Sequence, residues 1–332
     1  MEKIAFITNG SFIYWSSIIL TLAVVTAIAV FVALYSRRSG NGLAICLMIP
    51  LSIASSLVLS RFIHWYCRAD SYASMSAAMT DYSSGGYALM GAFGACLLCA
   101  CALRLVRIVK NLPQMLDCMA LAGGAGIAVG RLASFYNTSA RGMVMPENMG
   151  LPFAWQITNA VSGQVENRLA TFMLQSVVTA VIVIILLIQL SGEKTGKRTY
   201  RDGDICLLFL SAYGGSQIIL DSTRYDSLFM RSNGFISIVQ ILGAVAVVLA
   251  IVVFSVRMVK NRGMRPYFVS LWVVVLAMLG VVGYMEYHVQ RHGDQALFAY
   301  TVMTFGILIL VAVTVLIHRL GIRKIKKASF AR

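Results

Sequence analysis

An arginine stands at the end of an apolar run in the stretch VGRLASFYNTSARG, which covers Val129–Gly142. The guanidinium of Arg131 stays charged and donates hydrogen bonds in a planar fork, a geometry that suits phosphate. Ser134, Asn137 and Ser139 follow it and add polar groups within a few residues. The simpler interpretation is a side chain that reaches the lipid headgroups and sets the depth of a membrane helix. The neighbouring polar residues favour a binding site for an anionic headgroup.

A second polar cluster lies in the stretch AYGGSQIILDSTRYD. Its polar side chains follow one another at spacings of four, four and three residues, at Tyr213, Gln217, Asp221 and Arg224. On a helix these spacings place the side chains on one face, which in a membrane must meet protein or a water-filled cavity. An ion pair between Asp221 and Arg224 that satisfies only itself is the alternative. Two arginine-bearing faces together predict a site for a phosphate group.

Glycines accompany both regions. The stretch YSSGGYALMGAFG contains Gly85, Gly86, Gly91 and Gly94. These glycines allow close backbone approach, and Ser83 and Ser84 before them are candidate helix caps. Just before Arg131, Gly126 and Gly130 form a G-x-x-x-G pair, which lets a second helix pack closely. We therefore expect Arg131 to face the interior of a helix bundle.

Composition identifies the elements that must position these residues. Of the 332 residues, 59% are hydrophobic and 12% are charged, about half the charged share of a soluble domain. Long apolar runs recur along the chain, which predicts an all-α, polytopic membrane helix bundle. The formal charge of +15 lies in short clusters between these runs, so it marks membrane flanks and excludes nucleic acid as a partner.

Apolar length predicts nine spans, at 12–35, 43–63, 86–108, 115–136, 170–190, 205–222, 235–256, 267–287 and 296–317. Most of the 28 lysines and arginines fall on one side of this alternation, as expected for the cytoplasmic face. The N-terminus is therefore expected outside and the C-terminus inside. Two long outer segments, about 64–85 and 137–169, indicate that the working surface faces outward.

Seven cysteines lie mostly within apolar runs. Cys96, Cys99 and Cys101 share one predicted helix, with no histidine near them in the sequence. We interpret them as small packing residues, because thiols pack well among apolar side chains. We expect neither a metal ion nor another cofactor.

The polar segments resemble the motifs of the prolipoprotein diacylglyceryl transferase family. The family signature reads G-R-x-G-N-F-x-N-x-E-x-x-G, and the chain matches it at Gly130, Arg131, Phe135, Asn137 and Gly142. It departs from the signature at Ala133, Ser134 and Ser139. The family's H-G-G motif corresponds to Ser84, Gly85 and Gly86. Its Y-G-x-x-R-F-x-x-E-x-x-R motif corresponds to Tyr213, Gly214, Gln217, Asp221 and Arg224.

The resemblance implies transfer of a diacylglyceryl group from phosphatidylglycerol to a lipobox cysteine thiol at the outer leaflet of a bacterial cell membrane. Phosphatidylglycerol and the signal peptide of a preprolipoprotein are the implied partners. Residues 1–256 would form the family's seven-helix domain, 257–318 two additional helices, and 319–332 a basic cytoplasmic tail. The implied catalytic residues are Arg131, Asp221 and Arg224. The implied substrate-binding residues are Gly85, Gly86, Gly130, Ser134, Asn137, Ser139, Gly142, Tyr213 and Gln217.

The proton acceptor for the thiol is left open, because Ser84 and Ser139 replace the family's histidine and glutamate and serine is a poor base at neutral pH. The alternatives in outer segments or at outer helix ends are Asp81, Tyr136, Glu147, Glu166, Glu286 and His288. A relative without catalysis that binds a phospholipid or lipoprotein in the same pocket is the competing function. A transporter is disfavoured because the polar residues crowd the outer ends and no internal repeat is evident. An intramembrane serine protease is disfavoured because no serine–histidine pair is evident on facing spans.

Overall fold

The structure is a computed structural model and describes residues 4–8, 11–81, 85–137, 140–145, 154–158, 163–191, 200–230, 233–292 and 295–329. The chain forms two compact units. The first consists of Met1–Val183 with Arg224–Val239, and the second of Ile184–Thr223 with Gln240–Arg332.

Helices dominate both units. Eight helices in the described part are long and apolar enough to cross a membrane: α1 Trp15–Arg37, α2 Gly42–Cys67, α5 Leu112–Arg131, α6 Thr171–Ser191, α7 Asp204–Ser222, α8 Ile238–Arg262, α9 Pro266–His292 and α10 Ala296–Ser329. The apolar helix α4, Leu89–Leu105, has 17 residues. Each predicted span overlaps one of these helices, so the predicted class of an all-α membrane bundle is confirmed.

Three antiparallel hairpins, which we did not predict, precede or connect the helices. They are β1 Ile4–Thr8 with β2 Ser11–Tyr14, β3 Ala154–Thr158 with β4 Val165–Leu169, and β5 Phe229–Met230 with β6 Asn233–Ser237. Helix α1 therefore begins at Trp15 and α8 at Ile238, three residues after each predicted start. Residues 11–14 and 235–237 contain apolar side chains, so apolar length cannot separate the end of a strand from the start of a helix.

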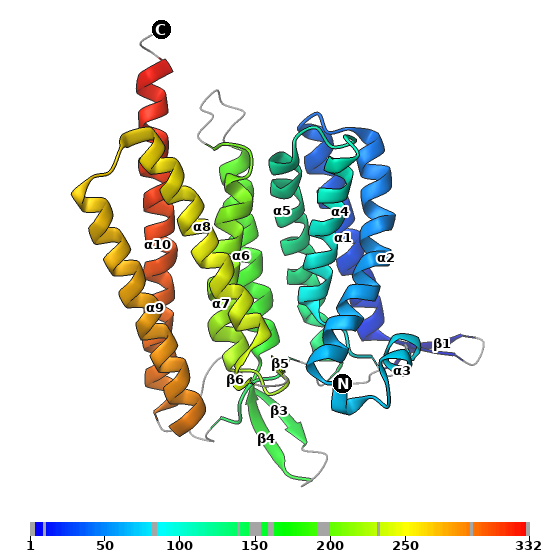
Figure 1. Ribbon diagram of the computed structural model, residues 1–332. Helices are drawn as coiled ribbons and strands as arrows, with labels where there is room; N and C mark the ends of the chain where they lie inside the picture. Colours follow the sequence, from blue (N-terminus) through cyan, green and yellow to red (C-terminus); the bar gives the residue numbers. More distant parts are fainter. Residues whose placement is uncertain are drawn as a thin grey trace. The chain divides into compact units, whose positions relative to one another are not determined.

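Close helix packing in the first unit depends on glycine. Helices α1 and α5 lie side by side (Figure 1), and a Cβ at Gly126 would lie 2.9 Å from the Cβ of Ala27. The predicted close approach at the G-x-x-x-G pair is thus confirmed. Helices α2 and α4 also pack together, and a Cβ at Gly91 would lie 2.4 Å from the Cα of Ser60. Both contacts hold the ends of α2 and α5 in fixed positions.

At the interface of α2 and α4, Cys99 lies 3.2 Å from the hydroxyl of Ser55, which agrees with a packing role for the thiol. Helix α4 begins at Leu89 with Ala88 as its N-cap. The predicted capping role of Ser83 and Ser84 is therefore wrong, because both precede the cap by several residues.

One end of the first unit carries the irregular segments. Helix α2 is followed there by the 3-10 turn η1, Ala69–Ser71, and the short helix α3, Met75–Thr80. Helix α5 continues into a second 3-10 turn, η2, Leu132–Phe135. The hairpins of this unit lie at the same end (Figure 1). This end corresponds to the predicted outer side.

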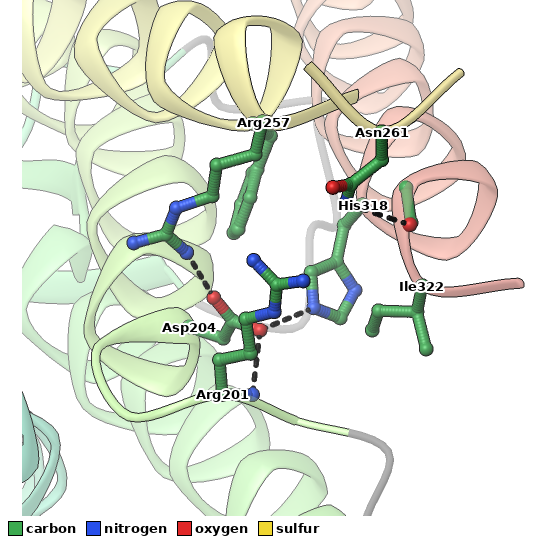
Figure 2. A pocket seen from close by; sticks show the side chains of 8 residues that line it. Arg201, Asp204, Arg257, Asn261, His318 and Ile322 are labelled. Carbon is green, nitrogen blue, oxygen red and sulfur yellow. Dashed lines mark hydrogen bonds and ion pairs between the residues drawn. The ribbon is translucent and has the colours of Figure 1, made fainter. Parts of the chain in front are cut away.

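A buried polar network joins helices of the second unit (Figure 2). The carboxylate of Asp204, 2% exposed, accepts hydrogen bonds from the guanidinium of Arg257 and from the backbone N–H of Arg201 at 2.8 Å. Its other contact is with Nε2 of His318, at 3.0 Å. Because these residues belong to α7, α8, α10 and the segment before α7, the network fixes α10 against α7 and α8. Helix α10 continues to Ser329, beyond the predicted end of its span at 317.

Candidate active site

Arg224 lies just beyond the end of α7, which finishes at Ser222. The predicted helical stripe therefore ends before Arg224, because the chain leaves the helix there. The Nε and Nη2 atoms of Arg224 donate to one carboxylate oxygen of Asp226 at 3.0 and 2.9 Å. Its backbone pairs with Gly142 in an isolated antiparallel bridge. Arg224 is thus held by the chain segment that follows the arginine-bearing end of α5.

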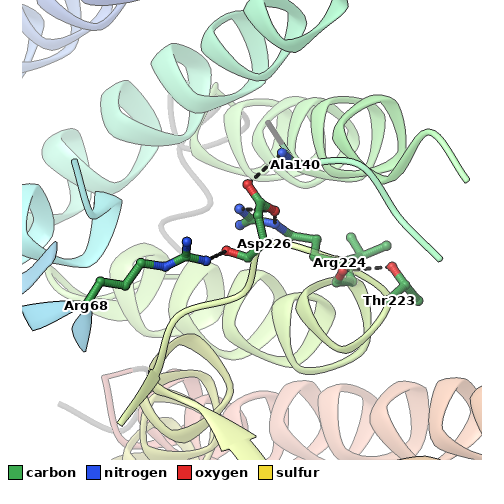
Figure 3. A network of polar contacts seen from close by, with 6 residues as sticks. Arg68, Ala140, Thr223, Arg224 and Asp226 are labelled. Atoms are coloured by element: carbon green, nitrogen blue, oxygen red, sulfur yellow. Dashed lines mark hydrogen bonds and ion pairs between the residues drawn. The ribbon is translucent and has the colours of Figure 1, made fainter. Parts of the chain in front are cut away.

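Asp226 connects three segments of the first unit (Figure 3). Its second carboxylate oxygen accepts a hydrogen bond from the backbone N–H of Ala140 at 3.0 Å. Its backbone carbonyl lies 3.4 Å from a guanidinium nitrogen of Arg68, the residue after α2. The backbone N–H of Tyr225, the preceding residue, donates to the carbonyl of Arg141 at 2.9 Å. The end of α2, the segment after η2 and the segment after α7 therefore meet at one place.

The matched signature occupies the end of α5 and the turn after it. Arg131 is the last residue of α5 and is partly buried. Ser134 is 5% exposed within η2, and Asn137 is partly buried. A Cβ at Gly130 would lie 3.4 Å from the Cβ of Ala23, so α5 is in van der Waals contact with α1 next to the arginine.

Gly142 closes this segment by backbone pairing. Its N–H donates to the carbonyl of Leu169 at 2.8 Å, and a Cβ there would lie 2.5 Å from the hydroxyl of Thr171. Any larger side chain would displace β4 or the start of α6. Ser139, the remaining predicted residue of the signature, lies outside the described residues.

Two further arginines, Arg141 and Arg168, were missed as site residues. The Nη2 of Arg141 donates to the carbonyl of Asn137 at 3.0 Å, while its Nε is buried and meets no hydrogen-bond acceptor among the described residues. Burial, and then the nearby charge of Arg168, lower the pKa of Arg141. Arg168 itself pairs with Glu166 at 2.8 Å. An arginine remains charged at neutral pH despite such a shift, so Arg141 offers an anion a guanidinium that Glu166 does not neutralise.

The sequence held a signal for Arg141, since it is the second arginine of the polar stretch that opens at Val129. Sequence reasoning did not select it because only the fold shows that the charge of Arg168 lies near it and that its Nε is buried without an acceptor among the described residues.

The glycine pair of the third motif lies beside a buried arginine at the end of α2. Gly85 and Gly86 have φ angles of 65° and 81°, in the left-handed region that favours glycine. Arg61, 1% exposed, donates to the carbonyls of Gly86 at 3.0 Å, Ala78 at 2.6 Å and Asp81 at 2.5 Å. A buried charge must be met by such acceptors, so Arg61 fixes the whole segment from α3 to Gly86 against α2.

The predicted residues of α7 lie in the second unit. Tyr213, Gln217 and Asp221 are 4%, 1% and 1% exposed, so they share a buried face as their spacing predicted. Arg131, Gly142 and Arg224 belong to the first unit. The participation of the three α7 residues in catalysis or binding stays a prediction.

The candidate proton acceptors lie in different places. Asp81 is exposed after α3, Glu166 is ion-paired, and Tyr136 stacks on Trp15 with ring centroids 6.0 Å apart. In α9 of the second unit, Glu286 is 4% exposed and accepts a hydrogen bond from Gln290 at 3.0 Å. His288 lies on the same helix and is partly buried, and Glu147 lies outside the described residues.

A family model described as "Prolipoprotein diacylglyceryl transferase" matches residues 3–256. The chain belongs to this family. The matched region contains every residue of the arginine-rich end described above. It finishes within α8, so α9 and α10 lie beyond the residues that define this transferase family.

Curated relatives carry the name phosphatidylglycerol–prolipoprotein diacylglyceryl transferase. The one from Finegoldia magna is 26% identical over 265 residues, covering 79% of this chain and 97% of the relative. The one from Parasynechococcus marenigrum is 23% identical over 245 residues, covering 71% and 86%. The one from Clostridium botulinum strain Hall is 22% identical over 249 residues, covering 74% and 94%. Low identity over nearly the full length of these relatives marks the chain as a divergent member.

Proposed function

We propose that the protein transfers a diacylglyceryl group from phosphatidylglycerol to the thiol of a lipobox cysteine in a preprolipoprotein signal peptide. The reaction takes place at the outer leaflet of a bacterial cell membrane. The observation that carries the proposal is the meeting of the Gly142 segment with Arg224 and Asp226, within the region matched by the transferase family.

The arginines of this end have a defined task in such a reaction. The cysteine sulfur attacks the glyceryl carbon bonded to the phosphate oxygen, the carbon–oxygen bond breaks, and glycerol phosphate leaves with the bonding electrons. Negative charge grows on the departing phosphate, so fixed guanidinium groups stabilise the transition state more than the ground state. Arg131, Arg141 and Arg224 are assigned this role, with Asn137 as a further hydrogen-bonding partner.

The arrangement of Arg224 supports this assignment. Its ion pair with Asp226 holds the guanidinium in one orientation, and a fixed donor costs little reorganisation during reaction. Arg141 supplies positive charge without a neutralising carboxylate among the described residues. The oriented guanidinium of Arg224 and the uncompensated one of Arg141 together suit this substrate. Its phosphodiester carries a single negative charge, and further negative charge develops as glycerol phosphate leaves.

The test uses purified full-length protein in phosphatidylglycerol vesicles labelled in the acyl chains, together with a lipobox peptide. Label should move to the peptide thiol, and a peptide with serine in place of cysteine should stay unlabelled. Arg131→Ala should reduce transfer by at least about 100-fold, as expected when a donor to the developing charge is removed. Label that stays with the protein and never reaches the peptide would instead support the non-catalytic, lipid-binding alternative.

A further inference from the structure

The transferase reaction proposed above needs a group that takes the proton from the cysteine thiol, because the thiolate is the nucleophile. The first unit contains one histidine in its sequence, His64, since the others are His288, His292 and His318. His64 was not among the residues that the sequence singled out. It lies in the last turn of α2 and is partly buried.

The imidazole of His64 lies directly against Gly86, the second glycine of the third motif. A Cβ at Gly86 would lie 2.6 Å from Cε1 and 2.8 Å from Nδ1 of this ring. The same Cβ would lie 2.7 Å from the hydroxyl of Tyr72. Glycine at position 86 therefore leaves the space that the imidazole occupies, and α2 brings a histidine to the segment where the family motif has its own.

Tyr72 holds the ring in one orientation. Its hydroxyl lies 2.9 Å from Nδ1 of His64, and the two rings meet edge to face with centroids 5.9 Å apart. Arg61 lies over the ring of Tyr72 at 5.1 Å and donates to the carbonyls of Ala78 and Gly86, which follow it in the chain. When Nδ1 donates its hydrogen to the tyrosine oxygen, Nε2 carries the lone pair. Among the described residues, Nε2 of His64 has no hydrogen-bond partner.

His64 is also close to the arginine-rich end in the fold. The N–H of Arg68 donates to the carbonyl of His64 at 3.0 Å, so the two residues are one helical turn apart. The guanidinium of Arg68 reaches the carbonyl of Asp226, whose carboxylate binds Arg224. A base on α2 and a phosphate-binding cluster thus lie at the same end of the first unit.

We propose that Nε2 of His64 accepts the proton of the lipobox thiol and that Tyr72 is its positioning residue. The thiol loses its proton to Nε2, the sulfur forms its bond to the glyceryl carbon, and the carbon–oxygen bond to phosphate breaks. The imidazolium then returns the proton to the released glycerol phosphate. Atoms and charge balance without any additional reactant.

The experiment compares two acceptor peptides that differ in one atom. A cysteine peptide needs a base, whereas the matched selenocysteine peptide, kept reduced, is largely ionised at neutral pH and needs none. His64→Gln should lower transfer to the cysteine peptide by at least about 100-fold, the usual contribution of general base catalysis. Transfer to the selenocysteine peptide should stay within about threefold of the unmodified protein.

Two variants sharpen the comparison. Tyr72→Phe should lower kcat with the cysteine peptide by about 10-fold, leave KM unchanged, and have little effect with selenocysteine. Tyr66→Phe, a change at a 42% exposed tyrosine on the same helical turn, should match the unmodified protein with both peptides.

The possible results separate this inference from the proposed function. If the unmodified protein transfers label and His64→Gln transfers equally to cysteine, His64 is not the base. If His64→Gln loses transfer to both peptides alike, its role is structural and the inference is overturned. If the unmodified protein labels neither peptide, the transferase function itself fails, and with it the role of His64.

Discussion

At the scale of single residues, Arg141 and Arg224, which lie next to Gly142, differ in whether a carboxylate compensates their positive charge. Arg224 is bound by Asp226, whereas Arg141 has a buried Nε without an acceptor among the described residues. Burial and Arg168 lower the pKa of Arg141, which means that its charged form is less stable in the folded chain than in the unfolded one. Such a cost is typical of a residue retained for binding.

This difference predicts opposite effects of Arg141→Gln on stability and on binding. Without phosphatidylglycerol, the thermal unfolding midpoint should stay equal or rise, because a poorly satisfied charge is removed. The Kd for phosphatidylglycerol should rise by about 10-fold, equivalent to about 1.4 kcal/mol. Both are measurable in detergent, by a thermal melt and by lipid titration.

Lys110→Gln is the matched control, since it removes one positive charge from an exposed residue between α4 and α5. It should change neither quantity. Equal loss of affinity in both variants would mean that only net charge matters and that Arg141 forms no site.

The glycine pair beside the end of α2 allows a second test at the same scale. Gly85 and Gly86 both have positive φ, but only at Gly86 would a Cβ meet His64 and Tyr72. Gly86→Ala should therefore displace the imidazole and lower transfer by at least about 10-fold relative to Gly85→Ala, which carries backbone strain alone. Equal transfer rates for the two variants, measured with the cysteine peptide, would argue against the packing of His64 on Gly86.

At the scale of elements, helix packing around Gly126 fixes the position of Arg131. A Cβ at Gly126 would crowd Ala27 and the carbonyl of Ala23, at 2.9 and 3.1 Å, whereas a Cβ at Gly123 would approach no closer than 4.0 Å to Phe93. Gly126→Ala should thus destabilise the protein by about 1–3 kcal/mol through overpacking. Gly123→Ala should be neutral or stabilising, because alanine favours the helix. Thermal melts of both variants in one detergent decide this, and equal midpoints would contradict the packing of α1 on α5.

The helices were predictable from the sequence for a simple physical reason. A membrane span needs about 20 apolar residues, and that requirement leaves a strong signal. The hairpins were not predictable, because a strand such as β3 has only five residues, too few for apolar length to separate it from a loop or from the start of a helix. The errors at the starts of α1 and α8 have the same cause.

Part of the candidate site could be predicted from the sequence and part could not. Arg131, Gly142 and Arg224 stood out by residue type and by resemblance to a motif. Asp226 and His64 did not, because their importance arises from contacts over long sequence separations, such as those of Asp226 with Ala140 and Arg68. No local pattern records such contacts.

At the scale of the whole molecule, α10, which lies beyond the family match, is bound to other helices of the second unit by polar contacts. His318 of α10 and Arg257 of α8 both contact the buried carboxylate of Asp204 on α7. Asp204→Ala removes the carboxylate that Arg257 and His318 both bind, so these two side chains lose their shared hydrogen-bond partner. We expect a loss of about 1–3 kcal/mol, because hydrogen bonds to a buried carboxylate are lost while the side chain of Arg257 is 32% exposed and keeps contact with solvent.

Asp70→Ala, a change at an exposed aspartate of η1 in the first unit, is its control and should cost much less. The measurement is thermal unfolding together with protease cleavage at the α8–α9 connection, residues 263–265, which should accelerate only in Asp204→Ala. Equal behaviour of the two variants would mean that the network does not hold α10 in place.

The central claim is that this protein is a working transferase despite its altered motifs. The most direct measurement is the mass of a lipobox peptide after incubation with the purified protein and phosphatidylglycerol, with released glycerol phosphate quantified in the same sample. We predict a thioether-linked diacylglyceryl peptide and one glycerol phosphate per modified peptide, both lost in Arg131→Ala. Binding of phosphatidylglycerol without a mass change on the peptide and without glycerol phosphate would contradict the account.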